Sequence, residues 1–154
     1  MQIVRLLLLS ALFLAISAKS VKADEWENNL KAKATQQFQT GLRAEQAGDL
    51  NQALEWYRKA MSNYPSFKEV HYKAGLAAAR LGMNDEAMLE FRQALNLDNN
   101  YVQARNDYAL FLQHNKNDEE GAMQQWKQCK QINPKYPFPY YFTGLVLHRR
   151  GDLD

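Results

Sequence analysis

The side chains best suited to chemistry are three histidines and one cysteine, because imidazole binds metals and moves protons and a thiolate is a nucleophile. They are His71, His114, His148 and Cys129. No two of the histidines stand four residues apart, the spacing that brings a pair onto one helical face as a metal site. The sequence also lacks a glycine-rich phosphate-binding loop. We therefore predict no metal, no cofactor, no small-molecule substrate and no enzymatic activity.

Cys129 cannot form an internal disulfide, since the chain has a single cysteine. We interpret it as a small buried residue, because a free cysteine packs like a small hydrophobic side chain. A disulfide between two copies of the chain is the alternative.

An apolar run near the N-terminus predicts a targeting segment. Residues Leu6–Ala18 follow Arg5 and carry no charge, and these 13 residues fall short of the about 20 that a membrane-spanning helix needs. Val21–Ala23 suits a signal peptidase, so we predict a signal peptide over residues 1–23, cleaved after Ala23. Cleavage after Ala18 and an uncleaved membrane anchor are the alternatives. The mature chain is then exported to the periplasm or the cell exterior, and meets a membrane only if the segment is retained.

Removal of this segment changes the net charge of the chain. The full sequence has 19 Lys and Arg against 17 Asp and Glu, a formal charge of +2. Residues 1–23 hold three basic side chains and no acidic one, which leaves 16 against 17 and a charge of −1 in the remainder. A nucleic-acid-binding domain needs a surplus of basic side chains to neutralise phosphates. We therefore predict no nucleic-acid partner.

The remainder of the chain is built on a period of 34 or 35 residues. Small residues recur at two positions of the unit, Gly41–Gly75–Ala109–Gly144 and Ala53–Ala87–Ala122. Three further sets keep the same steps: Tyr57–Phe91–Trp126, Ala60–Ala94–Cys129 and Pro65–Asn99–Pro134. Glycine weakens a helix by about 1 kcal/mol relative to alanine, so its recurrence inside a helical pattern indicates a place where two helices cross closely.

These five sets resemble the tetratricopeptide repeat, a 34-residue unit folded as helix–turn–helix. The resemblance covers nearly all of the chain after Lys33. It implies an all-α, right-handed superhelical solenoid of about three and a half repeats. The units are residues 34–67, 68–101 and 102–136, with a partial fourth or capping helix over 137–154 and a lead-in over 24–33.

The turns inside the units follow from their glycines. Gly48 and Gly82 stand between the two helices of the first and second units, where glycine supplies a left-handed helix end. The third turn has one extra residue and no glycine there, so we expect Asn115 or Asn117 to take that conformation in a longer loop.

The resemblance implies that the first helix of each unit lines a concave groove. Leucine stands at unit position 9 of all four first helices, where the family's typical residue is asparagine, and an aromatic stands at position 5 of three of them. We therefore expect an apolar groove floor that takes an amphipathic helix or an extended peptide. The predicted groove residues are Phe38, Leu42, Tyr72, Lys73, Leu76, Arg80, Asn106, Asp107, Leu110, Tyr141, Leu145 and Arg149.

The alternative is that the leucines are covered. Strong curvature of the array, or the segment Glu25–Lys33, could cover them, since apolar stripes usually belong to a core.

Tetratricopeptide proteins that bind chaperone tails clamp a terminal carboxylate with basic and amide side chains. The corresponding positions here hold Phe38, Leu42, Gln103 and Asp107, so we expect no carboxylate capture.

The last unit stops where its second helix should begin. Tyr140, Thr143, Gly144 and Leu147 face the position of that helix, so either the array is truncated or this edge is covered by something else.

We predict an interaction adaptor or scaffold of the cell envelope that binds a protein or peptide. Its fold class and targeting resemble small exported repeat proteins that help to assemble envelope machinery. The alternative is a structural protein that self-associates through this edge into a homo-oligomer.

Overall fold

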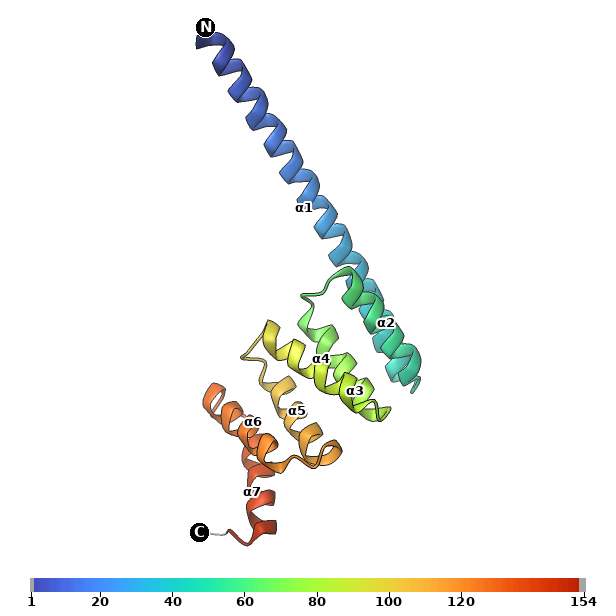
Figure 1. Ribbon diagram of the computed structural model, residues 1–154. Coiled ribbons are helices and arrows are strands. Elements are labelled where there is room, and N and C mark those ends of the chain that lie inside the picture. Colours follow the sequence, from blue (N-terminus) through green and yellow to red (C-terminus); the bar gives the residue numbers. More distant parts are fainter. Residues whose placement is uncertain (1, 153–154) are drawn as a thin grey trace.

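The computed structural model describes the backbone of residues 2–152 and the side chains of residues 22–152. In that part the chain forms seven α-helices and no strand (Figure 1). They are α1 (Gln2–Gln46), α2 (Leu50–Asn63), α3 (Lys68–Arg80), α4 (Asn84–Leu97), α5 (Val102–Asn115), α6 (Glu119–Ile132) and α7 (Phe138–Arg150). Three helical hairpins, α1–α2, α3–α4 and α5–α6, follow one another, and α7 packs against α6. The predicted all-α solenoid of helix–turn–helix units is confirmed.

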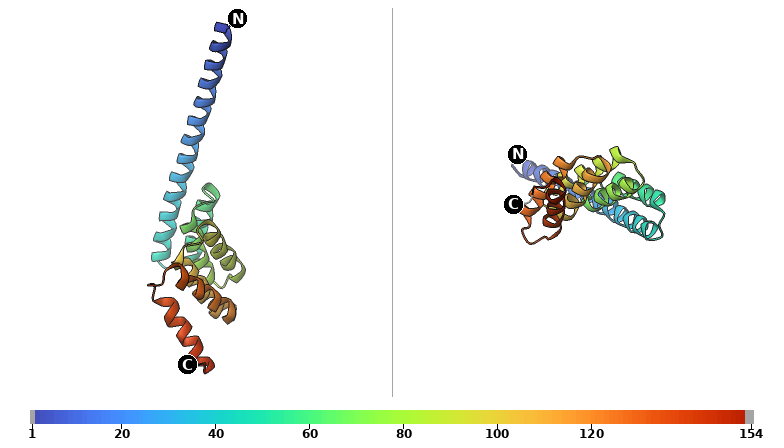
Figure 2. Two further views of the ribbon diagram at one scale, coloured as in Figure 1. Left: turned by 90° about the vertical axis from the view of Figure 1, so that its left-hand side faces the viewer. Right: turned by 90° about the horizontal axis from the view of Figure 1, so that it is seen from below.

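α1 is much longer than the other helices and passes without a break through the predicted boundaries at residues 23 and 33. Figures 1 and 2 show its N-terminal part projecting away from the array. Residues 25–33 are exposed apart from the half-buried Leu30, so this segment does not cover the groove leucines. The predicted signal peptide lies almost wholly outside the described side chains and stays a prediction. Residues 153–154 of the partial fourth unit also lie outside the described part.

The turns inside the units are closed by left-handed residues and carboxylate caps. Gly48 and Gly82 have φ angles of 84° and 75°, as predicted, and Asn117 takes the same region in the longer third turn with φ 53°. The carboxylates of Asp49 and Asp118 accept backbone N–H groups of the following helix, at 2.9 Å and 2.8 Å. Such caps satisfy amide groups that have no partner inside the helix.

Within a unit, the aromatic side chain of the second helix lies on the small residue of the first. A Cβ added at Gly41 would stand 2.5 Å from Cε1 of the buried Tyr57, and one added at Gly75 would stand 3.2 Å from the ring of Phe91. Ala109 and Trp126, at the same positions of the third unit, are both fully buried. Any side chain larger than hydrogen at Gly41 would therefore displace Tyr57.

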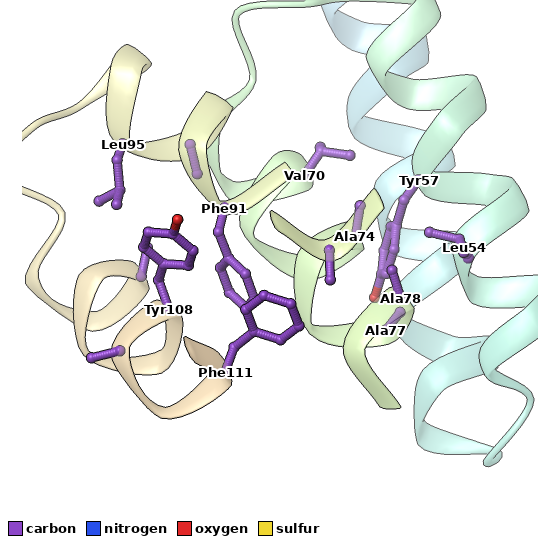
Figure 3. Close-up of a cluster of buried hydrophobic side chains, with 14 of the residues drawn as sticks. Leu54, Tyr57, Val70, Ala74, Ala77, Ala78, Phe91, Leu95, Tyr108 and Phe111 are labelled. Atoms are coloured by element: carbon purple, nitrogen blue, oxygen red, sulfur yellow. The ribbon is translucent and has the colours of Figure 1, made fainter. Parts of the chain in front are cut away.

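Between units, aromatic rings continue the core. Phe91 of α4 lies with its ring centroid 5.7 Å from those of Tyr108 and Phe111 on α5. Figure 3 shows this cluster beside Leu95, and shows Tyr57 facing the alanines of α3. The same kind of ring that closes one unit thus forms the contact surface for the next.

A side chain at unit position 4 ties each of the later units to the turn before it. His71 Nε2 lies 2.8 Å from the carbonyl oxygen of Pro65, Arg105 Nη2 donates to that of Asn99 at 2.8 Å, and Tyr140 donates to that of Pro134 at 3.1 Å. Each bond reaches back six residues to the end of the preceding second helix. We call these three hydrogen bonds the turn tethers.

Among the described residues, those that pack on α7 cover one of its faces. Phe142 stacks on Trp126 of α6 with ring centroids 5.5 Å apart, and Val146 is fully buried. A Cβ added at Gly144 would meet nothing within 4 Å, whereas the same position in the first two units lies under an aromatic ring. The side of α7 that carries Gly144 therefore has space where the other units have a second helix.

This difference predicts opposite effects of one substitution at two glycines. Gly41→Ala should lower the free energy of unfolding by about 1–3 kcal/mol, because the new methyl group displaces the buried Tyr57. Gly144→Ala should raise it by up to about 1 kcal/mol, because alanine is the better helix former and nothing obstructs its methyl group. Denaturant unfolding followed by circular dichroism measures both, and equal effects of the two substitutions would contradict this packing.

Candidate protein-binding groove

The first helices carry a pocket of about 310 Å³ between α3 and α5. Its lining consists of Leu76, Ala79, Arg80, Phe91, Asp107, Leu110, Phe111, His114 and Asn115. The apolar members form the walls, and Arg80, Asp107 and His114 bring charge or polarity to the pocket. Four of the twelve predicted groove residues therefore meet here: Leu76, Arg80, Asp107 and Leu110.

The predicted leucine row divides into two kinds of position. Leu42, Leu76 and Leu110 are half-buried and pack against the hydrophobic core, so part of each side chain stabilises the array. Leu145 is 48% exposed on α7. The leucines of this row thus contribute both to the hydrophobic core and to the apolar surface. Both interpretations of the row, as groove floor and as core, therefore hold in part.

The aromatics at unit position 5 pack inside the array in the first two units. The ring of Phe38 lies 5.7 Å from that of Tyr57 and 5.2 Å from that of Phe67. Tyr72 lies in the same way 5.2 Å from Tyr101. Tyr141 differs, because its side chain is 62% exposed on α7.

Hydrogen bonds and an ion pair link neighbouring first helices. The hydroxyl of Tyr72 on α3 donates to Asp107 Oδ2 on α5 at 2.6 Å. Lys73 Nζ lies 3.2 Å from Glu45 Oε2 on α1, and the hydroxyl of Tyr57 donates to the same carboxylate at 2.7 Å. Burial and the hydrogen bond to Asp107 raise the pKa of Tyr72 well above its usual range. The Lys73 ammonium is therefore paired with a carboxylate, whereas the Asp107 carboxylate accepts hydrogen bonds from neutral donors only.

Other predicted groove residues lie away from the pocket. Asn106 is only 3% exposed and donates to Asp107 Oδ1 at 3.1 Å, so it lies beneath the surface rather than on it. Arg149 pairs with Glu119 on α6. Phe38, Leu42, Lys73, Tyr141 and Leu145 do not line the pocket. The structure therefore brings together the middle of the predicted groove and separates its two ends.

Two aromatic residues that line the pocket were not predicted from the sequence. Phe91 comes from a second helix, and Phe111 stands at unit position 10, so neither belongs to the positions that line a groove in the family pattern. Phe91 and Phe111 contact each other with ring centroids 5.7 Å apart, and both line the pocket. No signal in the spacing of residues could have indicated this contact.

The groups that could have done chemistry have structural surroundings. His71 Nδ1 lies 2.6 Å from Glu90 Oε2, and its Nε2 faces the carbonyl oxygen of Pro65. Burial lowers the pKa of His71, but the two hydrogen bonds together raise it by more, so the net shift of the pKa is upward. Burial raises the pKa of the Cys129 thiol to about 11, which keeps it protonated near neutral pH.

Among the described residues no three His, Cys, Asp or Glu side chains are placed to hold a metal ion. Within that same part, no helix has the length and apolar character to cross a bilayer.

A row of helical hairpins with an apolar pocket on the face of its first helices defines the chain as a helical-repeat protein. A family model described as tetratricopeptide repeat matches residues 68–101, the same residues as the second predicted unit. This match and the helix–turn–helix array support the tetratricopeptide repeat family for this chain.

Two curated relatives match parts of the chain. The photosystem I assembly protein Ycf3 of Prochlorococcus marinus (strain NATL1A) is 32% identical over 87 residues, which are 54% of this chain and 50% of that protein. The human protein O-mannosyl-transferase TMTC3 is 23% identical over 104 residues, 68% of this chain but 11% of its own length. The chain thus spans half of the first relative and about a tenth of the second.

Solved structures share the fold at low sequence identity. The crystal structure of MamA has a TM-score of 0.72 and 20% identity, over 87% of this chain and 74% of that one. The first tetratricopeptide domain of Spaghetti (RPAP3), bound to the HSP90 peptide SRMEEVD, has a TM-score of 0.72 and 16% identity, over 79% of this chain and 95% of that one. Identities of this size indicate a common fold and leave the ligand open.

Proposed function

We propose that the chain is an adaptor that holds a segment of another protein against its first helices, and that it has no catalytic role. The observation that carries this proposal is the apolar pocket at Leu76 and Leu110, where a partner could bury a large apolar side chain. A partner that covers this apolar pocket stabilises the complex by roughly 25 cal/mol for each Å² of apolar surface removed from water.

The comparisons support binding of a peptide without fixing which one. The Spaghetti domain has the same fold and binds an HSP90 peptide. In this chain Phe38, Leu42 and Asp107 stand at positions where a clamp for a terminal carboxylate needs basic or amide side chains. We therefore propose an internal segment of the partner, either an amphipathic helix or an extended stretch, which presents an apolar residue to the pocket.

The pocket edges suggest the polarity of that segment. Arg80 is exposed at the end of α3, while the Asp107 carboxylate already accepts hydrogen bonds from Tyr72 and Asn106. The pocket rim thus carries the positive charge of Arg80, and beside it the Asp107 carboxylate, whose oxygens are held by neutral donors. An acidic residue next to the apolar anchor would pair with Arg80 at the rim, where such a pair contributes about 1 kcal/mol or less.

A capture experiment with pocket variants tests this proposal. The variant Leu76→Glu/Leu110→Glu should lose the partner that the wild type captures from native cells, because it places two charges in the apolar pocket. Leu89→Glu on α4, where the leucine is 54% exposed outside the pocket, is the matched control and should keep the partner.

Because both pocket leucines also contact the core, the double variant must retain its helical circular dichroism. Arg80→Glu changes an exposed position at the rim of the pocket and provides a second test. This substitution should weaken capture of the partner several-fold. A partner that all three variants retain equally would place its contact outside the groove and refute the proposal.

We further propose that the chain acts in the cell envelope after export, on the strength of the apolar segment Leu6–Ala18 and the peptidase-compatible Val21–Ala23. If so, the protein recovered from its native cells should begin at Asp24. Mass spectrometry of the intact chain measures this directly. A chain that retains Leu6–Ala18 and partitions with membranes would favour the anchor instead.

Self-association through α7 is the second candidate function. It is favoured by the open space at Gly144 and by the exposed side chains of Tyr140, Tyr141 and Leu145 on the same helix. A second copy could cover this face as the second helices cover the earlier units. Light scattering over a range of concentrations should then show a dimer or larger species that Gly144→Trp alters, whereas a monomer at all concentrations would rule this function out.

A further inference from the structure

A second pocket, of about 450 Å³, lies where α4, α5 and α6 meet. It is polar, in contrast to the apolar groove pocket, and the proposed adaptor function does not use it. Its lining includes Arg92 and Asn96 of α4, Arg105 and Tyr108 of α5, and Gln125 and Gln128 of α6. We call it the arginine pocket.

The innermost group of the arginine pocket is a cation without a counter-charge. Arg105 is only 5% exposed and donates to the side-chain oxygens of Gln125 and Gln128 and to two oxygens of Asn99. Its Nε has no partner, and no carboxylate among the described residues forms an ion pair with it. Burying a charge costs several kcal/mol when only neutral groups surround it, so an anion nearby would stabilise Arg105.

Arg92, Tyr108 and the two glutamines of the pocket keep donor hydrogens for a ligand. Arg92 donates from Nε to the hydroxyl oxygen of Tyr108 at 3.1 Å, which leaves its two terminal nitrogens and the hydroxyl hydrogen free. Gln125 and Gln128 turn their oxygens toward Arg105, so their NH₂ groups remain to donate. The pocket therefore combines the guanidinium group of Arg92, a hydroxyl and two amides as donors, with the buried charge of Arg105 behind them.

The surroundings of the pocket keep this positive character. An adjoining hollow shares Arg92, Tyr108 and Gln125 and adds Lys116 and Asp118. The Asp118 carboxylate is engaged as the cap of α6, with the N–H of Gly121 at 2.8 Å. Lys116 lies 3.4 Å from Asp85 on the exposed surface. Among the described residues no carboxylate lines the arginine pocket itself, and the one in its continuation, Asp118, is held as a helix cap.

We propose that the arginine pocket binds the carboxylate of a Glu or Asp side chain from a partner protein. The planar, two-pronged end of Arg92 matches a carboxylate in two parallel hydrogen bonds, and the Tyr108 hydroxyl and the glutamine amides complete its coordination. The buried charge of Arg105 lies behind these donors and attracts the same anion across a medium of low polarity. The site is separate from the groove pocket and does not depend on the proposed function of that groove.

The test is a nuclear magnetic resonance titration of the full chain with capped tripeptides. Acetyl-Gly-Glu-Gly-amide should shift the side-chain amide resonances of Gln125 and Gln128 in a saturable way, and acetyl-Gly-Gln-Gly-amide should not. Arg92→Gln should weaken binding of the acidic peptide about tenfold, because the substitution removes a charge-assisted pair of hydrogen bonds. Lys127→Gln, which removes the same charge from an exposed position of α6 outside the pocket, should leave binding within about twofold of the wild type.

Three outcomes would overturn the proposal. Equal weakening by Arg92→Gln and Lys127→Gln would show a response to net charge alone. The absence of saturable shifts with the acidic peptide would remove the site. Inorganic phosphate that shifts the same resonances at lower concentration than the peptide would replace the carboxylate by a phosphate as the ligand. Arg92 is exposed, so its replacement tests the site without removing the buried Arg105.

Discussion

The contact of an aromatic ring with a residue that has little or no side chain is the interaction on which this array depends. Tyr57 lies on Gly41 and Phe91 on Gly75, and each ring fixes the distance between the two helices of its unit. Phe91 then contacts Tyr108 and Phe111, so the position of one unit determines the position of the next. Because stacked units contact only their neighbours, the solenoid follows from repetition of this contact.

The fold could be predicted because this contact leaves a periodic trace in the sequence. Gly41 and Gly75 are costly inside a helix, and their spacing of 34 residues has no local explanation, so they indicate helix crossings. The length of α1 could not be predicted in the same way. Residues 22–29 of this helix are exposed, and the periodic pattern says nothing about residues that do not repeat.

The candidate site was predicted in part, and the part that failed has a physical reason. The family pattern gives the face on which Leu76 and Leu110 lie, but it does not say how far apart neighbouring first helices stand. Asn106 was expected on the surface and is buried, with its amide donating to Asp107 Oδ1. The arginine pocket was not predicted, since Arg105 and Gln128 come together only after α6 folds back on α5.

α5 presents opposite faces to the two pockets: Asp107 and Leu110 line the one on the first helices, and Arg105 and Tyr108 line the other. The turn tether of Arg105 to Asn99 fixes the start of this helix close to the end of α4. Both pockets therefore share α5 as a wall, and a substitution that shifts this helix would alter the shape of both.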